Sequence, residues 1–453
     1  MGQGGAATSG RGLTALQVAA ALKAAAAVQL GDAASAAAVS SPTLRRTRSG
    51  VAEHSSAIKP EDCSAVQELT APSSDAGGAR VDVRVTEYAP SVFHFVRQVE
   101  GVADAHFADE WSLPEERLRM ELGEGRSQAL FLKSKSMAFM CKTIAVEEVQ
   151  VLLRVLRAYA LHISANPSSL LMRFYMLLRV SVGKEEGYIL CFNDVFGAAT
   201  VLHEKWDIKG RVPKPGKYEY FPHLIRRAYE PDPYLIETPK NRDVVVNPAA
   251  AEAQQHLHDG RDAVVVKGAE DAQKLSTLHD KDLTRLFWLP HKTRKRLLQQ
   301  LLSDYVFLRD AGLMDYSLLI GVAYQESKQS RSGKRYVIEN MKMTAPRGAA
   351  SASPCVEVRP ASPVASGNKA MKFITLSEFA NGVHSLYDQE IYYIGIIDML
   401  TTYTIKKKSA NFFKSFLWEQ DTLSTVPPSR YAQRITSFTK LIFPSVHGES
   451  HGG

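Results

Sequence analysis

The chain has 453 residues, 45% hydrophobic and 23% charged, so it can build a large core and still carry tails and insertions. Its four cysteines are scattered without a CxxC pair, which argues against a zinc site and a disulfide framework. No apolar run reaches the roughly 18 residues that a membrane span needs, and no convincing secretory signal opens the chain. The net charge of +7 favours polyanionic partners, although solubility alone explains it equally well.

The first 85 residues differ in composition from the rest of the chain. They are rich in alanine, serine and glycine, and they carry a basic cluster, Arg45-Arg46-Thr47-Arg48. Such a segment offers few large apolar side chains for a core, so we predict a mostly disordered tail over residues 1–85. Within it, the alanine-rich stretch 13–30 is suited to a transient helix.

Residues 86–205 are predicted to form a first folded unit. Val92, Phe93 and Val96 are spaced as on one face of a short helix. The remaining predicted elements are strands at 129–132 and 138–144, a helix at 149–163, and strands at 173–180 and 188–196. The pattern of strands around one long helix indicates a small sheet-based unit.

Residues 206–446 are predicted to form a second unit with two partly disordered insertions. The first insertion, 211–275, is irregular and rich in proline, and the second, 340–385, is dominated by alanine, serine, proline and glycine. The predicted elements are helices at 297–308 and 431–442, and strands at 317–322, 336–338 and 391–397. The expected fold class is therefore α+β, with a mainly antiparallel sheet and flanking helices in each unit.

A glycine-rich turn precedes a strand that carries a lysine. Gly123, Gly125 and Ser127 lie in the turn, and Lys142 lies on the strand. Backbone N–H groups of such a turn can approach phosphates closely, and the lysine can neutralise phosphate charge. An ordinary hairpin followed by an exposed lysine is the alternative interpretation.

The surroundings of Lys142 favour a partly buried position. Apolar residues flank it along the strand, and a buried ammonium group needs an anionic partner. Glu147 and Glu148 open the following helix and are the candidates, although acidic residues in a first helical turn also simply complement the helix dipole.

Two aspartates stand at junctions between predicted elements. Asp315 follows a helix and precedes an apolar strand, where a carboxylate can accept the proton of an attacking hydroxyl. Asp398 ends an apolar strand, where a carboxylate can hold Mg²⁺ on nucleotide phosphates. In isolation, a turn aspartate bonded to local N–H groups explains each of them as well.

The segment that follows the strand at 391–397 combines lysines with aromatic residues. Lys406, Lys407, Lys408 and Lys414 lie among several phenylalanines and Trp418. Ammonium groups attract an anionic bilayer and aromatic rings insert at its surface, so this loop is a candidate membrane contact. A solvated charge run beside a core helix is the alternative.

Taken together and in order, these segments resemble the phosphatidylinositol phosphate kinase family from about Leu118 to Phe443, apart from the two insertions. The order of the motifs makes coincidence a poor explanation. The most specific pieces are Met314-Asp315-Tyr316-Ser317-Leu318-Leu319, Gly395-Ile396-Ile397-Asp398, Asp207-Ile208-Lys209-Gly210 and Lys142-Thr143-Ile144.

The resemblance implies a two-lobed lipid-kinase fold and a role for each motif. Lys142 would contact the phosphates of ATP, Asp315 would be the catalytic-loop aspartate, and Asp398 would hold Mg²⁺. Asp207 and Lys209 would belong to the same active site. The segment with the lysines would be the activation loop, which selects the lipid and docks on the membrane.

Three positions depart from the family pattern. Gln128 replaces the second glycine of the glycine-rich loop, and Arg211 replaces the serine that follows the Asp-Leu-Lys-Gly motif. Ala410 stands where 4-phosphate 5-kinases carry glutamate and 5-phosphate 4-kinases carry alanine. On that position the chain resembles the 4-kinases, whereas the wider occurrence of 5-kinase activity favours phosphatidylinositol 4-phosphate as substrate.

The rival functions explain fewer of the motifs. A protein kinase would carry Phe-Gly after its metal-binding aspartate, but Met399 and Leu400 follow Asp398. A catalytically weak phosphoinositide-binding scaffold remains an alternative, and a nucleic-acid ligand would explain the charge but not the motifs. We therefore expect an ATP- and Mg²⁺-dependent lipid kinase, cytoplasmic and peripheral on the cytosolic face of the plasma membrane. A homodimer is compatible with this expectation, but the sequence does not determine the oligomeric state.

Overall fold

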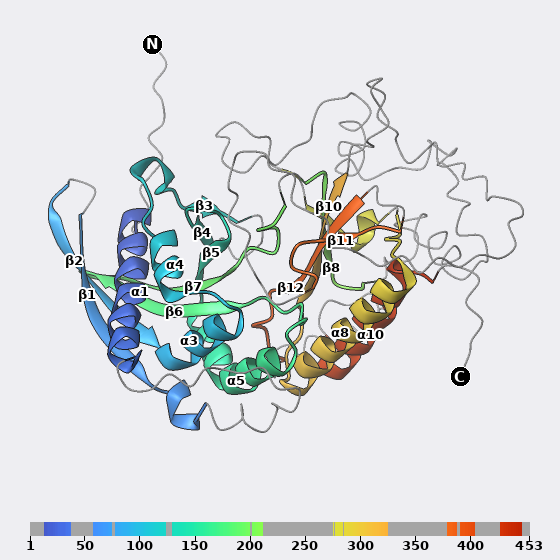
Figure 1. Cartoon of the computed structure of the whole chain (residues 1–453), viewed down its shortest axis with the longest axis horizontal. Helices are drawn as coiled ribbons and strands as arrows, with labels where there is room; N and C mark the ends of the chain where they lie inside the picture. Colours follow the sequence, from blue (N-terminus) through green and yellow to red (C-terminus); the bar gives the residue numbers. More distant parts are fainter. Residues whose placement is uncertain are drawn as a thin grey trace, which may run out of the picture.

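The computed structural model describes eleven stretches of the chain. They are residues 13–37, 58–74, 78–123, 129–199, 202–211, 275, 277–283, 285–324, 378–386, 390–403 and 426–445. They form a mixed α+β structure with two sheets (Figure 1). Among these residues, no helix is both long enough and apolar enough to cross a membrane.

The first sheet has seven strands in the order β1-β2-β6-β7-β5-β4-β3, and every neighbouring pair is antiparallel. Its central strands β6 and β7 carry runs of consecutive buried apolar residues, as expected where both faces of a sheet are covered. The strands are β1 (Val66–Ser74), β2 (Arg80–Tyr88), β3 (Glu121–Leu122), β4 (Leu130–Lys133), β5 (Phe139–Ile144), β6 (Phe174–Val182) and β7 (Glu185–Asn193).

The second sheet has five strands in the order β11-β12-β10-β8-β9. Its pairs are antiparallel except for β8 and β9, which run parallel. The sheet is therefore mainly antiparallel, as predicted. The strands are β8 (Glu204–Ile208), β9 (Thr277–His279), β10 (Ser317–Tyr324), β11 (Val383–His384) and β12 (Glu390–Ile397).

Six α-helices lie within the described residues, with three short 3₁₀ turns (Pro60–Cys63, Glu115–Arg117 and Asp280–Asp282). Figure 1 shows α1, α3 and α4 around the seven-stranded sheet, while α8 and α10 run side by side next to the five-stranded sheet. The helices are α1 (Ala15–Ala37), α3 (Pro90–Val99), α4 (Asp104–Glu110), α5 (Val146–Ala165), α8 (His291–Asp310) and α10 (Pro428–Ile442).

The predicted disordered tail over residues 1–85 is wrong for residues 13–37, 58–74 and 78–85. Helix α1 buries Val18 and Leu22 together with small alanines, which allow the helix to pack closely on β1, β2 and α4. Strand β2 alternates apolar and polar residues and buries Val83 and Val85. The composition of the segment hid this alternation, because the small residues around it dominate the average. The remaining residues of the predicted tail lie outside the described stretches.

The other predicted elements are mostly confirmed. The predicted helices at 92–96, 149–163, 297–308 and 431–442 correspond to α3, α5, α8 and α10, and the strand predictions correspond to β4, β5, β6, β7, β10 and β12. The second insertion is corrected at its C-terminal end, because β11 within 340–385 pairs with β12. The predicted strand at 336–338 and nearly all of the first insertion lie outside the described residues.

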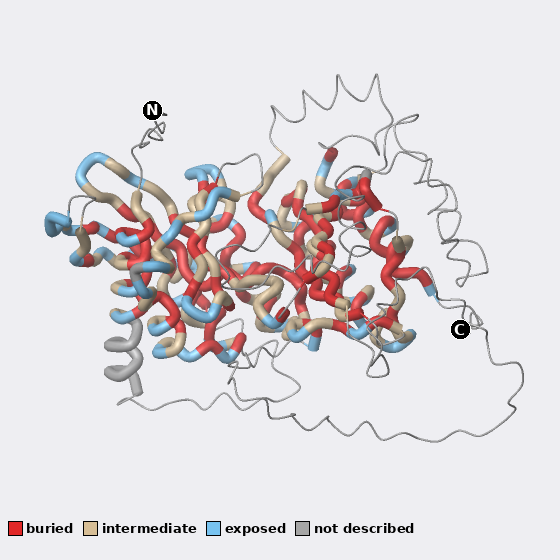
Figure 2. Tube along the Cα trace, turned by 90° about the horizontal axis from the view of Figure 1, so that it is seen from above, coloured by how far each residue is buried: buried red, intermediate tan, exposed pale blue. Residues whose placement is uncertain are grey.

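A short connection between α5 and β6 joins the two sheets. The N–H of Ile396 in β12 donates to the carbonyl of Leu170 at 2.7 Å, and the N–H of Met172 donates to the carbonyl of Ile396 at 2.9 Å. These bonds form a parallel bridge between Leu171 and Ile396. One apolar cluster accordingly includes buried residues of both sheets, and Figure 2 shows buried segments running through the middle of the molecule.

Candidate active site

Lys142 lies on β5 and points away from the side of the sheet that Phe139 and Cys141 bury. Successive side chains on a strand alternate between faces, so Lys142 shares its face with the half-buried Met140. The lysine side chain is only 14% exposed, and its Nζ lies 3.7 Å from Glu148 Oε1 and 3.6 Å from Asp398 Oδ1. The predicted anionic environment of this lysine is therefore present, and one of the two carboxylates comes from the other sheet.

Glu148 has two functions at once. Its Oε2 accepts a hydrogen bond of 3.0 Å from the N–H of Ala145 at the start of α5, while Oε1 faces Lys142. The capping bond holds the carboxylate in place, because the helix N-terminus favours negative charge and has unpaired N–H donors. Of the two glutamates considered from the sequence, Glu148 is the one that the structure pairs with Lys142.

Asp315 and Asp398 lie at the same end of the five-stranded sheet. Strand β10 begins at Ser317 opposite Ile397, the last residue of β12, so the two aspartates flank neighbouring strand ends. Both aspartates have left-handed backbone conformations, with φ of +63° for Asp315 and +58° for Asp398. Left-handed backbone is strained for a residue with a side chain, and such strain is typical of functional sites.

Lys209 lies beside Asp315. Its Nζ donates a hydrogen bond of 2.8 Å to the Asp315 carbonyl and lies 3.6 Å from Asp315 Oδ1. The structure therefore brings the Asp-Ile-Lys-Gly segment at the end of β8 to the same sheet end as Asp315 and Asp398. Physical reasoning from the sequence could not place this segment, and the resemblance alone indicated its role.

Asp280 fixes the backbone that carries Lys209. Its buried carboxylate accepts hydrogen bonds from the N–H groups of Lys209, Gly210 and Arg211, with the shortest at 2.7 Å to Gly210. Burial raises the pKa of the Asp280 carboxyl, and the N–H donors oppose that shift. The sequence prediction missed this residue, because 70 residues separate it from Gly210, and an acidic pair after Leu278 was the only signal.

The position of Gly210 requires a residue without a side chain. Its φ is +70°, and a Cβ at this position would lie 3.0 Å from the Cα of Ile435 in α10. A glycine thus lets the chain turn away from Lys209 directly against a helix. The turn at Gly210 and the carboxylate of Asp280 together fix the backbone position of Lys209, from which its side chain extends to Asp315.

Asp207 lies on the same face of the sheet as Leu319 and Gly395, which are opposite it in successive strands. Its Oδ1 atom is buried and has no hydrogen-bond partner among the described residues. A buried carboxylate oxygen without a donor is costly, so it indicates a position where a ligand, a cation or water completes the hydrogen bonding.

The glycine-rich turn is described only at its start. Gly123 follows β3, its N–H donates to the carbonyl of Ala129 at 2.9 Å, and a Cβ there would lie 2.5 Å from the ring of Phe131. Gly125 and Ser127 lie outside the described residues, as does the predicted membrane loop with Lys406, Lys407, Lys408, Ala410 and Lys414. Their roles stay predictions.

The residues present suit Mg²⁺ held together with nucleotide phosphates. Within the described stretches, no group of three or more His, Cys, Asp or Glu side chains forms a complete metal cage. Mg²⁺ in phosphoryl-transfer sites is usually held by one or two carboxylates, with phosphates and water as the other ligands. Asp398, half exposed beside Lys142, fits that requirement as one such carboxylate.

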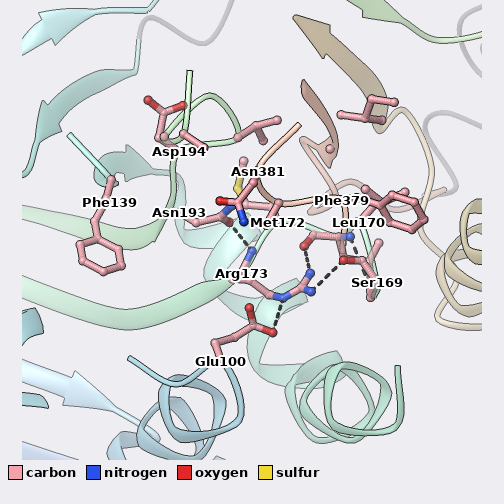
Figure 3. Close-up of a pocket in the computed structure, with 18 of the residues that line it drawn as sticks. Glu100, Phe139, Ser169, Leu170, Met172, Arg173, Asn193, Asp194, Phe379 and Asn381 are labelled. Carbon is pink, nitrogen blue, oxygen red and sulfur yellow. Dashed lines mark hydrogen bonds and ion pairs between the residues drawn. The ribbon is translucent and has the colours of Figure 1, made fainter. Parts of the chain in front are cut away.

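A cavity between the two sheets lies on the face of β5 opposite to Lys142. The cavity has a volume of about 90 Å³, and Figure 3 shows Phe139, Arg173 and Asn193 around it together with Phe379 and Asn381. Phe139 and Lys142 point to opposite faces of β5, so this cavity is separate from the Lys142–Asp398 pair.

The floor of this cavity is closed by a buried ion pair. Arg173 donates 2.9 Å from Nε to Glu100 and 2.7 Å from Nη2 to the carbonyl of Ser169, and Nη1 bonds the carbonyl of Leu171. These bonds hold the connection between α5 and β6 against the first sheet.

Comparison with known proteins identifies the family. The family model described as "Phosphatidylinositol-4-phosphate 5-Kinase" matches residues 113–442, well over half of the chain. A probable phosphatidylinositol phosphate kinase of Dictyostelium discoideum is 24% identical over 79% of this chain and 47% of its own length. Phosphatidylinositol 4-phosphate 5-kinase 1 of Arabidopsis thaliana is 25% identical over 80% of this chain and 45% of its own length.

A mouse relative is named for the other activity, phosphorylation of the 5-phosphate lipid at position 4. Phosphatidylinositol 5-phosphate 4-kinase type-2 alpha of Mus musculus is 26% identical over 78% of this chain and 76% of its own length. The chain thus spans about half the length of the first two relatives, and similar identities link it to both kinds of kinase. From the extent of the family match, the chain belongs to the phosphatidylinositol phosphate kinase family.

Proposed function

We propose that the protein transfers the γ-phosphoryl group of ATP to an inositol-ring hydroxyl of a phosphatidylinositol monophosphate. The observation that carries this proposal is the 3.6 Å approach of Lys142 Nζ in one sheet to Asp398 Oδ1 in the other. A phosphate-binding lysine and a metal-binding carboxylate must face the same phosphates, and they belong to different sheets here. In this interpretation, the two sheets are the two lobes of a lipid kinase and ATP binds between them.

Each described residue has a defined task in this reaction. Lys142 neutralises phosphate charge, and Glu148 keeps the lysine directed towards Asp398. Asp398 would hold Mg²⁺, which would spread the charge that develops on the phosphates. These groups supply positioning and electrostatic stabilisation, which dominate catalysis of phosphoryl transfer.

Asp315 acts on the attacking hydroxyl. Its carboxylate accepts the hydroxyl proton as the oxygen attacks the γ-phosphorus, and ADP leaves with the electrons of the broken P–O bond. Lys209 holds the Asp315 carbonyl and faces its carboxylate, so it keeps this strained residue directed towards the substrate. The strain at Asp315 persists because the neighbouring Met314 N–H is also fixed, to the carbonyl of Thr401 at 2.9 Å.

The preferred substrate in this proposal is phosphatidylinositol 4-phosphate, with phosphatidylinositol 4,5-bisphosphate as product. The name of the Arabidopsis relative, phosphatidylinositol 4-phosphate 5-kinase 1, supports this assignment. Ala410 supports the alternative, phosphatidylinositol 5-phosphate 4-kinase activity, and the mouse relative bears that name. The relative similarity to the two groups does not favour either isomer.

The decisive experiment is a product analysis. The purified protein is incubated with Mg²⁺, ATP and vesicles that contain either the 4-phosphate or the 5-phosphate lipid, and the product is identified by its ring positions. We expect conversion of the 4-phosphate lipid. Conversion of the 5-phosphate lipid alone would establish the alternative isomer, and absence of any product with both lipids would favour a phosphoinositide-binding scaffold.

We also propose that the segment 406–414 docks the enzyme on anionic membranes of the cytosolic face. Replacement of Lys406, Lys407 and Lys408 with alanine removes three positive charges, each worth about 1 kcal/mol near an anionic surface. Sedimentation with anionic vesicles should therefore fall markedly, and more so at low salt. Unchanged sedimentation of the triple variant would remove this segment from the membrane contact. Neutral vesicles are the matched control.

A further inference from the structure

Asp304 is a fully buried carboxylate that the proposed chemistry does not use. It lies in α8 and accepts four hydrogen bonds from donors in three different segments. The donors are Leu170 N at 2.7 Å, Ser169 Oγ at 2.8 Å, His162 Nε2 at 2.8 Å and Gln300 Nε2 at 3.1 Å. A buried charge of this kind is retained only where its hydrogen bonds are complete, and here they are.

The segments that meet at Asp304 carry the groups of the active site. Helix α5 holds His162 near its C-terminus and Glu148, the partner of Lys142, in its first turn. Helix α8 leads after one short turn to Asp315. Helix α5 therefore connects Asp304 with Glu148 along its length, whereas in α8 Asp304 lies in the last two turns before the turn that leads to Asp315.

The third segment reaches the metal-binding aspartate. Leu170 donates its N–H to Asp304, and its carbonyl accepts the N–H of Ile396, two residues before Asp398. Two consecutive hydrogen bonds thus connect the carboxylate of Asp304 with strand β12 just before its end. The same connection continues into β6, so it links both sheets.

Packing reinforces the same junction. The imidazole of His162 stacks on Phe307 of α8, with ring centroids 4.5 Å apart and planes inclined by 23°. The ring is fixed between this contact and Asp304, so α5 and α8 are held together by one apolar and one polar contact. Displacement of α8 would therefore shift α5 and the connection 169–172 together.

We propose that Asp304 is a positioning residue that sets the distance between Lys142 and Asp398 across the two sheets. The inference rests on the proposed function, because it assigns Asp304 an effect on Mg²⁺ and ATP through Asp398. In a reaction that depends on positioning, a displacement of about 1 Å can cost roughly 100-fold in rate. Asp304 touches neither ATP nor lipid and acts only through the elements that it joins.

The test is the variant Asp304→Asn, which keeps the shape of the side chain but replaces an acceptor oxygen with an N–H donor. Once activity is corrected for the folded fraction, we expect kcat to fall at least about tenfold. The Mg²⁺ concentration for half-maximal activity should rise several-fold, while KM for the lipid stays within about twofold of wild type. Asp310→Asn makes the same chemical change at an exposed carboxylate of the same helix, which pairs with Arg309, so it is the matched control and should change neither value.

A milder variant keeps the proposal testable if Asp304→Asn fails to fold. Ser169→Ala removes only one of the four donors and should lower kcat about threefold, with a smaller rise in the Mg²⁺ requirement. If both variants retain wild-type kcat and Mg²⁺ requirement, or lose activity only in proportion to the folded fraction, Asp304 has no positioning role.

Direct titration separates this inference from the proposed function. The affinity for ATP is measured by calorimetry with and without Mg²⁺ and without lipid. Asp304→Asn should weaken ATP binding in the presence of Mg²⁺ and leave binding without Mg²⁺ unchanged. If wild type phosphorylates no lipid, the proposed function fails, while an unchanged Mg²⁺ effect on ATP binding in the variant overturns the role of Asp304.

Discussion

The two ends of the five-stranded sheet carry charged clusters of opposite character. At one end, Lys209, Asp315 and Asp398 follow or precede the strand ends and form loose pairs, with Lys209 and Asp315 3.6 Å apart. At the other end, Arg285 bonds Glu204 at 2.9 Å and both oxygens of Glu390 at 2.6 and 2.8 Å.

The tight cluster pairs both of its carboxylates without any ligand, and only Nε of Arg285 in this group lacks a hydrogen-bond partner among the described residues. Tyr324 bonds Glu204, Tyr392 bonds Glu390, and the guanidinium of Arg285 also lies 5.2 Å from the ring of Phe287. Burial lowers the pKa of Arg285, but the two carboxylates raise it more, so the group stays charged. Both carboxylates, of Glu204 and Glu390, are directed at the guanidinium of Arg285 and not at solvent.

The loose cluster has unused capacity for binding. Its aspartates are 38% and 51% exposed and have left-handed backbones, and Asp207, near the end of β8, keeps a buried oxygen without a donor. The comparison teaches that charge density alone does not identify a site. Exposed carboxylates combined with left-handed backbone separate the candidate binding cluster from the structural one.

The largest expected effect is loss of catalysis at the loose end. Asp398→Asn and Lys142→Met should each lower the rate of lipid phosphorylation by about 10³-fold, because each removes several kcal/mol of charge stabilisation. Circular dichroism should show an intact fold, since both groups are partly exposed. Full activity of purified Asp398→Asn would falsify the metal assignment.

A substitution in the tight cluster should lower the stability of the fold and not the rate of the reaction. Arg285→Met leaves Glu204 and Glu390 buried without their cation, so we expect the free energy of unfolding to fall by about 3–5 kcal/mol. Urea denaturation measures this change, and the activity of the molecules that remain folded should be close to wild type. A stable but inactive Arg285→Met would show that the two ends are coupled.

Strain at Asp398 gives a smaller effect with a distinctive sign. Glycine usually destabilises a chain relative to alanine, but at φ of +58° the order should reverse. Asp398→Gly should be about 1 kcal/mol more stable than Asp398→Ala in urea, although both are inactive. Equal stability, or greater stability of the alanine variant, would mean that this backbone stores no strain.

The smallest effect concerns pH. Because burial raises the pKa of Asp280 in the folded state, its contribution to stability is greatest below the unfolded value near 3.8 and is lost as pH rises through the folded pKa. The melting temperature of wild type relative to Asp280→Asn should therefore decrease from about pH 4 to pH 7. An increase over that range would show that the N–H donors outweigh burial.

Much of this arrangement could be predicted from local sequence. Periodicity found α3, α5, α8 and α10 because each carries a regular apolar stripe, and junction positions singled out Asp315 and Asp398. The pairing of Lys142 with Asp398 could not be predicted, because it depends on how two sheets sit against each other. Asp280 and Asp304 were missed for the same reason, since their partners lie far away in sequence.

The N-terminal elements have a practical consequence for any shortened form of the protein. A chain that starts at residue 86 would match the compositional boundary but would lack α1, β1 and the first two thirds of β2. Strand β6 pairs with β2 along Arg84 to Glu87, so its backbone groups there would become an open edge. Open edges recruit other chains, so such a truncation should aggregate on expression, whereas one that starts before Leu13 should stay monodisperse.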